Sequence, residues 1–492
     1  MAYFAEVRTV ILYIENHVKD EKFDMDELSR AVGFSIAHVR DIFQRKTGIA
    51  LKKYVTMRKV YNSAFDLLHS KASVLEIALS YGFDSHETYT RAFKRIVKIT
   101  PKEFRRIRPQ TAKEMLASGV YGISVQGDVQ KGWIQMQERE MLKKDKSTIL
   151  FGVPMVGYGE YGFTPFPICL KACSNYLGED IDYEFSMVSS GAAFRFTWNR
   201  TEWDLSNVDI YHSFDENNEV YGVGAKALGR EFSILVRTKE TKKEDFQQFI
   251  KSHIDQGFPC IALGIVGPPE AGIITGYEED GDVLLGWSFF QHDPDFGAFV
   301  EFAENGYYKC RTWWENQDTQ AVMCIGDVIN EKMSLKDIIS NAIKVSTGRS
   351  EGPYEKGVAG LQAWKKAILN DSEFSTHSTE SSLHEKLMCH DDAMCCVMDG
   401  RSNASKFFWE RAEQSPYPLK MQELSCMYNQ EFLVLRRMEE LLLGWGHSKE
   451  RLEKFMEKET RVKVGAMIDE VIDIEKKAVT KLAQLKEAME VE

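Results

Sequence analysis

The sequence predicts a multi-domain α+β protein with an all-α head, a mixed α+β middle domain and a helical C-terminal region. Three observations carry this prediction. A helix–turn–helix pattern occurs twice in residues 1–110, short apolar segments bounded by turn residues fill 148–372, and long amphipathic segments fill 373–492. Residues 111–147 are predicted to be a linker. A chain of 492 residues also exceeds the roughly 250–300 residues that one hydrophobic core supports.

The composition is that of an ordinary globular protein, with 43% hydrophobic and 28% charged residues. No apolar run approaches the roughly 20 residues that a membrane-spanning helix needs, so no membrane contact is predicted. The first residues lack the basic and apolar regions of a signal peptide. Nine scattered cysteines are typical of reduced thiols rather than a disulfide framework. A cytoplasmic protein is therefore expected.

The charge is divided unequally along the chain, whose net charge is −12. Residues 1–110 contain 20 Lys and Arg against 13 Asp and Glu, so the head carries +7. The rest contains 42 basic and 61 acidic residues and carries −19. A basic head on an acidic body confines attraction for phosphate to one end of the chain.

The head divides into predicted helices by its apolar periodicity and its capping residues. Apolar residues within Val10–Val18 predict a first helix, Met25–Val32 a second that Gly33 ends, and Ser35 caps a third reaching about Thr47 before Gly48. A long helix over about Leu51–His69 joins the two halves. Ser73 caps Val74–Ser80, Gly82 turns the chain, Ser85 caps a helix reaching about Val97, and Pro101 opens a last short helix that carries Arg105, Arg106 and Arg108.

The second pattern is the more specific of the two. It runs from Ala78-x3-Gly82-Phe83 through Phe93-Lys94-Arg95 to Thr100-Pro101-x2-Phe104-Arg105-Arg106. Over about Ala5–Arg108 the chain resembles the AraC/XylS family of bacterial transcription regulators, in which two recognition helices enter successive major grooves. The resemblance implies base contacts from Ala37, His38, Arg40 and Asp41 in the first helix, and from Ser85, His86, Glu87, Thr90 and Arg91 in the second. Arg45, Lys46, Lys94 and Arg95 suit phosphate contacts.

Not every residue of these helices is expected to face DNA. The apolar side chains Phe34, Val39, Phe43, Phe83, Tyr89 and Phe93 are interpreted as core. Asp41 departs from the family's usual pattern, because an acidic group repels phosphate. The first helix then reads less sequence than the second, or Asp41 accepts a hydrogen bond from a cytosine amino group. The alternative for both polar faces is a solvated helix surface.

The middle of the chain mixes predicted strands and helices. Thr148–Pro154 and Pro259–Val266 are predicted strands, and Thr164-Pro165 begins a helix that reaches about Leu177. Gly272–Trp287 predicts a hairpin with its turn at Asp280-Gly281, and Leu361–Trp364 falls in a later helix.

This order, with Ser190-Gly-Ala-Ala-Phe-Arg195 and the hairpin, resembles papain-like folds over about 150–370, in particular the bacteriocin-processing peptidase-like group and the domain named after butirosin biosynthesis protein H. The resemblance implies a catalytic Cys at the start of the helix and a His at the start of the hairpin. Here Thr164-Pro165 and Glu270-Ala271 occupy these positions. No catalytic residue is therefore predicted, and Cys169 is interpreted as a buried thiol.

A cleft without its catalytic groups remains a concave pocket that can bind a ligand. Glu270 would face a cationic group there, and aromatic walls could come from Trp198, Trp203, Trp287, Phe289 and Phe290. The alternative for each aromatic residue is core packing.

The C-terminal region is predicted to be helical from about Thr379, with long amphipathic segments at Phe432–Leu443 and from Lys449 to about Met489. The sequence leaves open whether these helices cap the middle domain or form a dimer seam. Cys389-His390 and Cys395-Cys396 match no standard zinc spacing, so neither a metal nor a cofactor is predicted.

These features favour a bacterial transcription regulator whose body, residues 150–492, senses a small molecule and controls promoter binding. A cationic or amphipathic, antibiotic-like effector is expected, together with promoter DNA, a homodimer and, as a further partner left open, RNA polymerase. One alternative is a cysteine peptidase or acyl transferase fused to a DNA-binding head, with Cys169, Cys173 or Cys260 as nucleophile. The other is a body that serves as a docking platform for another protein.

Overall fold

The computed structural model describes residues 10, 14, 25–32, 34–47, 50–69, 72–97, 100–107, 140–158, 162–216, 218–293, 295–303, 305–374, 378–446 and 448–490. The chain divides into two compact units, residues 1–140 with 303–306 and residues 141–302 with 307–492. The regions 148–372 and 373–492, which were predicted to be separate, thus lie in one unit. No helix among these residues is long and apolar enough to cross a membrane.

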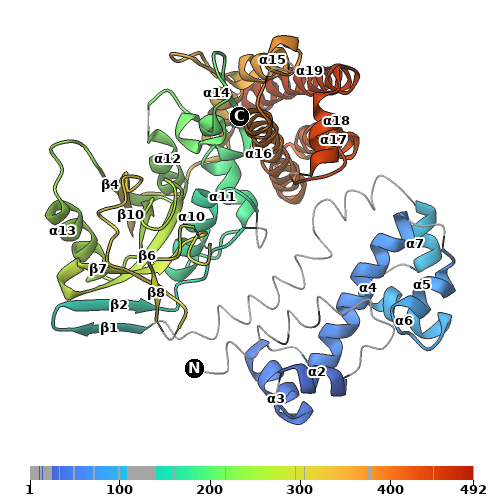
Figure 1. The fold of residues 1–492 in the computed structure, drawn as a ribbon, viewed down its shortest axis with the longest axis horizontal. Coiled ribbons are helices and arrows are strands. Elements are labelled where there is room, and N and C mark those ends of the chain that lie inside the picture. Colours follow the sequence, from blue (N-terminus) through green and yellow to red (C-terminus); the bar gives the residue numbers. More distant parts are fainter. Residues whose placement is uncertain are drawn as a thin grey trace. The chain divides into compact units, whose positions relative to one another are not determined.

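The first unit consists of helices and their connecting turns in the described part of residues 10–107 (Figure 1). Its elements are α2 (Met25–Val32), α3 (Ile36–Thr47), α4 (Leu51–His69), α5 (Val74–Ser80), α6 (His86–Val97) and α7 (Pro101–Ile107). These bounds agree with the predicted helices. Of the predicted first helix only Val10 and Ile14 are described, and both are buried. Gly33, Gly48, Arg108 and most of the predicted linker, 111–139, lie outside the described residues.

Aromatic side chains hold the second half of this unit together. Phe83, Tyr89, Phe93 and Phe104 contact one another in turn, with ring centroids 5.1–5.6 Å apart. The Tyr89 hydroxyl donates to Ser63 Oγ of α4 over 2.9 Å, so this buried polar atom has a partner. The buried side of α6 is therefore fixed on α4, and its other side is free for contacts outside the unit.

The second unit is built on an antiparallel sheet in the order β4-β10-β5-β6-β7-β9-β8, with the β1–β2 hairpin attached to β6 (Figure 1). Its strands are β1 (Glu140–Lys144), β2 (Ser147–Phe151), β4 (Arg230–Val236), β5 (Cys260–Leu263), β6 (Ala271–Glu278), β7 (Val283–Trp287), β8 (Glu301–Phe302), β9 (Tyr308–Cys310) and β10 (Ala321–Val328). A second ladder pairs β3 (Thr197–Asn199) with β11 (Tyr354–Lys356). The β6–β7 hairpin was predicted, whereas β1 lies in the predicted linker.

Two helices cover opposite faces of this sheet. His253 of α13 (Lys243–Ile254) lies beside Cys260 of β5. Leu263, three residues further along β5, lines a cavity together with the first residues of α10 (Pro165–Tyr176). Because side chains alternate between the faces of a strand, α13 and α10 lie on different sides of the sheet.

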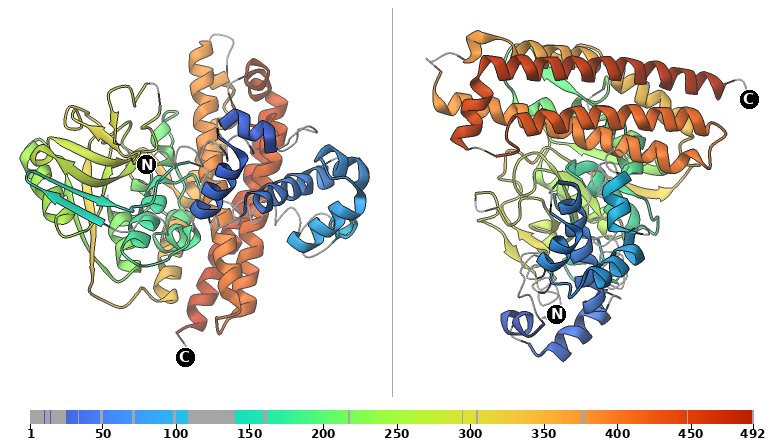
Figure 2. Two further views of the ribbon diagram at one scale, coloured as in Figure 1. Left: turned by 90° about the horizontal axis from the view of Figure 1, so that it is seen from below. Right: turned by 90° about the vertical axis from the view of Figure 1, so that its right-hand side faces the viewer.

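The remaining helices of this unit are α11 (Tyr183–Ser189), α12 (Glu219–Ala227), α14 (Leu335–Thr347), α15 (Gly357–Ile368), α16 (Glu380–Ala412), α17 (Pro418–Leu441), α18 (Lys449–Met456) and α19 (Lys458–Ala488). The long helices α16, α17 and α19 lie side by side as a bundle (Figure 2). The bundle also contacts α11 and α14, so the C-terminal helices cover the middle region, which is one of the two arrangements the sequence left open.

Candidate functional site

The helix α6 presents a polar face that the buried aromatic residues leave exposed. Ser85 begins the helix, and its Oγ accepts a hydrogen bond from the Thr88 N–H over 3.1 Å. Gly82, with φ of 65°, makes the preceding turn in a conformation that favours glycine. The predicted contact residues of this helix are exposed at His86, Glu87, Arg91, Lys94 and Arg95 and partly buried at Ser85 and Thr90. Five of the seven are therefore accessible, whereas the hydroxyl oxygen of Thr90 is buried.

Two further contacts fix the geometry before and after α6. Ser73 and Glu76 form a reciprocal cap on α5, because each side chain accepts a hydrogen bond from the other residue's N–H. These bonds lower the pKa of Glu76. Arg105 of α7 donates to the carbonyls of Leu67 and Ala72, over 3.0 and 2.6 Å. Arg105 is thereby engaged inside the unit.

The first predicted recognition helix, α3, has a similar start. Ser35 Oγ accepts from the His38 N–H over 3.3 Å, and the His38 ring lies 5.2 Å from that of Phe34. Ala37, Arg40 and Asp41 are exposed and His38 is partly buried. Phe34, which was predicted to be core, is 37% exposed. The side chains of Arg45 and Lys46 lie outside the described part of the structure.

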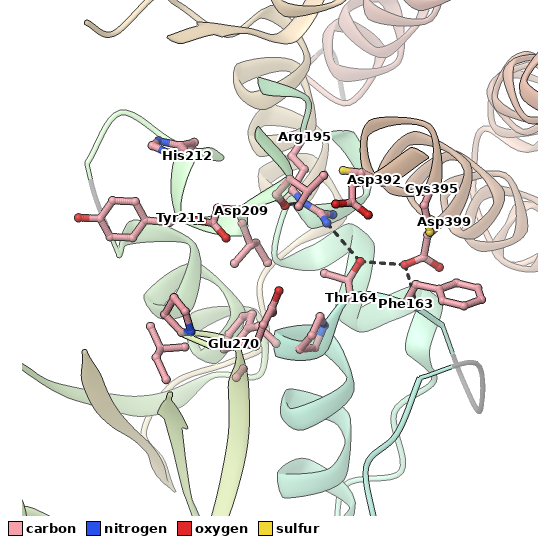
Figure 3. A pocket seen from close by; sticks show the side chains of 18 of the residues that line it. Phe163, Thr164, Arg195, Asp209, Tyr211, His212, Glu270, Asp392, Cys395 and Asp399 are labelled. Carbon is pink, nitrogen blue, oxygen red and sulfur yellow. Dashed lines mark hydrogen bonds between the residues drawn. The ribbon is translucent and has the colours of Figure 1, made fainter. Parts of the chain in front are cut away.

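The second unit contains a cavity of about 450 Å³ between the start of α10, the end of β5, the start of β6 and the helix α16 (Figure 3). Thr164 and Glu270, the two residues at the positions where the papain-like resemblance implies Cys and His, both line it. Aromatic side chains form much of its wall, namely Tyr158, Phe163, Phe166, Tyr211 and Tyr221. The cavity is thus concave, partly apolar and enclosed in part by α16.

Four carboxylates and one guanidinium give the cavity its charge. Asp399 is the partnered carboxylate: it accepts from Thr164 Oγ1 and the Tyr183 hydroxyl, both over 2.8 Å. Arg195 donates to the Ala192 carbonyl over 2.9 Å and approaches Thr164 Oγ1 at 3.4 Å. The Asp399 carboxylate and the Arg195 guanidinium therefore hold the start of α10 in place.

The other three carboxylates, Asp209, Glu270 and Asp392, surround one space (Figure 3). None of their side chains forms a hydrogen bond or a close ion pair with another described residue. Burial and the nearby Asp209 raise the pKa of Glu270 to about 7. Burial raises the pKa of Asp209 to about 6, although Arg195 opposes it, and burial with Asp391 raises the pKa of Asp392 to about 6. The cavity is thus most acidic, and most attractive to a cation, above pH 7.

Of the six residues predicted to bind a ligand, only Glu270 lines this cavity. Phe289 and Phe290 stand behind its wall, where both contact the ring of Tyr158. Trp287 is buried, and its indole N–H donates to the Val153 carbonyl over 3.0 Å. Trp198 and Trp203 line a different cavity of about 370 Å³. Asp209 and Asp392 carried no local sequence signal, because their role comes from facing Glu270 across long chain separations.

The cysteines considered as nucleophiles are poorly placed for that chemistry. Cys169 and Cys173 lie inside α10 rather than at its start, and both are buried. Burial raises the pKa of the Cys169, Cys173 and Cys260 thiols. His390, from the cysteine- and histidine-rich segment, lies against the rings of Trp364 and Phe455, and burial lowers its pKa to about 3.

These thiols are expected to react slowly with iodoacetamide in the folded protein at pH 7.5, because a raised pKa keeps them protonated. The exposed Cys426 should be labelled first. Mass spectrometry of peptides after timed labelling measures the order, and Cys426→Ser should remove the fast phase. Fast labelling of Cys169, Cys173 or Cys260 would instead support a cysteine peptidase or acyl transferase.

Comparisons with known proteins concern the first unit. A family model described as a helix-turn-helix domain matches residues 28–107. The transposon Tn10 TetD protein of Escherichia coli is 35% identical over 100 residues, which are 20% of this chain and 72% of that protein. The probable transcription factor PqrA of Proteus vulgaris is 34% identical over 100 residues, 20% of this chain and 82% of PqrA. The chain belongs to the AraC-type helix-turn-helix family.

Two further matches cover very different shares of the proteins concerned. The transcriptional regulator Rob of Salmonella typhimurium is 35% identical over 100 residues, which are 20% of this chain and 34% of Rob. Among solved structures, an AraC-type regulator from Chromobacterium violaceum is 22% identical with a TM-score of 0.21, and the match covers 22% of this chain and 94% of that one. These matches concern about a fifth of the chain.

Proposed function

We propose that this protein is a sequence-specific DNA-binding transcription regulator whose second unit binds a small organic cation and thereby controls promoter binding. The proposal rests on the exposed polar face of α6 for DNA and on three unpartnered carboxylates in one cavity for the ligand. Relatives that are named as transcription regulators support the first part.

The second recognition helix supports direct reading of base edges. Arg91 is exposed on α6, and an arginine in the major groove can donate two hydrogen bonds to guanine. His86, at the first turn of the helix, is exposed as well. Lys94 is exposed near the end of the helix, where a lysine suits a phosphate.

We expect Arg91→Ala and His86→Ala each to weaken specific binding by about 1–3 kcal/mol, because each removes a base contact. Lys94→Ala should weaken binding to all sequences alike. It should also reduce the slope of the logarithm of the binding constant against the logarithm of the salt concentration by about 1. The binding site is first selected from random duplexes with the full chain, and affinities are then measured by fluorescence anisotropy. Arg349→Ala, which removes an exposed arginine of the second unit, is the control. Unchanged affinity in both Arg91→Ala and His86→Ala would contradict the assignment.

The cavity supports a sensor rather than an enzyme. Under the proposal it corresponds to the cleft of a papain-like fold in which Thr164 and Glu270 replace the catalytic pair. Ionised carboxylates that lack partners in a partly buried site destabilise it until a cation binds. Aromatic walls add favourable contacts with an organic cation, because the faces of aromatic rings attract positive charge.

Coupling to DNA would be reciprocal. If the cation changes the affinity of the protein for the promoter, the promoter must change the affinity of the protein for the cation by the same factor. The proposal includes a homodimer, because regulators of this kind read paired sites. It also includes a contact with RNA polymerase. Promoter affinity measured with and without a cavity-binding cation tests the coupling, and equal affinities would leave the body without a sensory role.

A further inference from the structure

We propose that His253, Cys260 and Cys324 bind a zinc-class metal ion on the α13 face of the sheet. The site is distinct from the acidic cavity and does not depend on the function proposed for it. It brings together residues from α13, β5 and β10.

The sheet register places the two thiols beside each other. Cys324 of β10 is directly opposite Cys260 of β5, and on its other side Cys324 is opposite Ser233 of β4. The three side chains therefore form a row on one face of the sheet. Cys260 and Cys324 are at most 1% exposed, so the thiols are held by the packed sheet rather than by a loop.

His253 completes the group from the helix above this row. Its Nδ1 lies 2.8 Å from the Phe249 carbonyl, which can only accept a hydrogen bond. Nδ1 therefore carries the proton, and in the neutral ring Nε2 is left with a lone pair. Nε2 lies 3.1 Å from Ser233 Oγ, and the ligand atoms of His253, Cys260 and Cys324 all lie within 4.8 Å of one another. A backbone carbonyl on the second ring nitrogen is the arrangement that orients metal-binding histidines.

Two thiols and one imidazole are a donor set that zinc prefers over the oxygen-seeking ions magnesium and calcium. Small side-chain rotations would bring sulfur to about 2.3 Å and nitrogen to about 2.0–2.1 Å from an ion at the centre of the group. Ser233 Oγ or a water molecule could supply the fourth ligand. His253 and Ser233 are only partly buried, and β4 is at the end of the sheet, so an ion can enter from that side.

Binding would exchange protons for the metal. Both thiols must lose their protons, so one Zn²⁺ displaces two protons and the imidazole contributes its lone pair without further release. Because binding releases these protons, the affinity for zinc should rise with pH. The bound ion would tie α13 to the neighbouring strands β5 and β10.

The test uses the full chain, reduced and freed of metal with a chelator, and Co²⁺ alone as the probe. We expect one Co²⁺ per chain, with thiolate-to-cobalt absorption in the near ultraviolet and the strong visible bands of tetrahedral cobalt. Zn²⁺ should displace it stoichiometrically. His253→Gln and Cys324→Ser should each lower the affinity at least tenfold, and Cys310→Ser, a buried cysteine outside the group, should not.

Several results would overturn the proposal. One is cobalt binding without a thiolate-to-cobalt absorption band. Another is a Cys260–Cys324 disulfide that forms in the protein purified without reductant and that zinc does not prevent. The third is a loss of affinity in Cys310→Ser equal to that in Cys324→Ser. The measurement on the unmutated chain decides the matter even if a cysteine variant fails to fold, and His253→Gln alters a partly exposed residue.

Discussion

Arg401→Ala is expected to lower the free energy of unfolding of the second unit by about 3–5 kcal/mol, the cost of breaking a buried ion pair. Arg401 lies on α16, is 1% exposed, and its Nε donates to Glu431 of α17 over 3.2 Å and to Glu475 of α19 over 3.0 Å. Its Nη1 donates to the Ala193 carbonyl over 2.5 Å. One side chain thus connects the three long helices to the middle of the unit.

The cost arises because the two glutamates would remain buried without a cation. Burial and the nearby Glu475 already raise the pKa of Glu431 well above its usual value, because the site disfavours a second negative charge. After the substitution, the remaining charge has no partner. The backbone of α16 lies close to that of Ala193 here, because a Cβ at Gly400 would collide with the Ala193 carbonyl.

Urea denaturation followed by tryptophan fluorescence measures this effect. The matched control is Arg437→Ala, which breaks the exposed Arg437–Glu470 pair between α17 and α19 and should cost less than about 1 kcal/mol. Replacing Arg401, Glu431 and Glu475 together by apolar residues should recover most of the loss. Equal effects of the two arginine variants would show that the buried cluster contributes no more than a surface pair.

Glu270→Gln is expected to stabilise the protein without ligand by on the order of 2 kcal/mol at pH 8. The pKa of Glu270 is raised to about 7 in the folded protein, so the folded chain binds more protons than the unfolded chain between about pH 4.5 and 7. Its contribution to stability is therefore complete below about pH 4.5 and is lost as the pH rises through 7. Thermal midpoints of both proteins from pH 5 to 8 should diverge as the pH rises. Glu331→Gln, an exposed carboxylate, is the control.

The same substitution should have the opposite effect on ligand binding. A panel of aromatic amines and their neutral amide analogues is added at pH 8, and a cation that binds only the folded chain raises its thermal midpoint. The amines should act and the amides should not, and Glu270→Gln should weaken binding by about tenfold or more. The response should also weaken below pH 6, where the carboxylates are protonated. Amides that bind as well as amines would contradict a cationic ligand.

The predictions from sequence succeeded where the signal is local. The caps at Ser73 and Ser85, the turn at Gly82 and the hairpin turn at Asp280-Gly281 each depend on a few adjacent residues, and the structure has all of them at the predicted places. The polar face of α6 follows from helical periodicity alone. Glu270 was found because a family pattern marked its position, not because of its composition or spacing.

The aromatic residues show where this reasoning fails. The sequence does not distinguish a tryptophan that lines a cavity from one that packs in the core. Only the packing around Trp287 and Trp198 determines which role each has. The group formed by His253, Cys260 and Cys324 has no recognisable spacing either, since the register of two strands creates it. By itself the sequence determined the helices of the head and the polar face of α6, and a resemblance pointed to Thr164 and Glu270 in the body. Only the tertiary structure brought Asp209 and Asp392 to Glu270, and Arg401 to two glutamates, because these contacts join residues that are far apart in the chain and leave no local pattern.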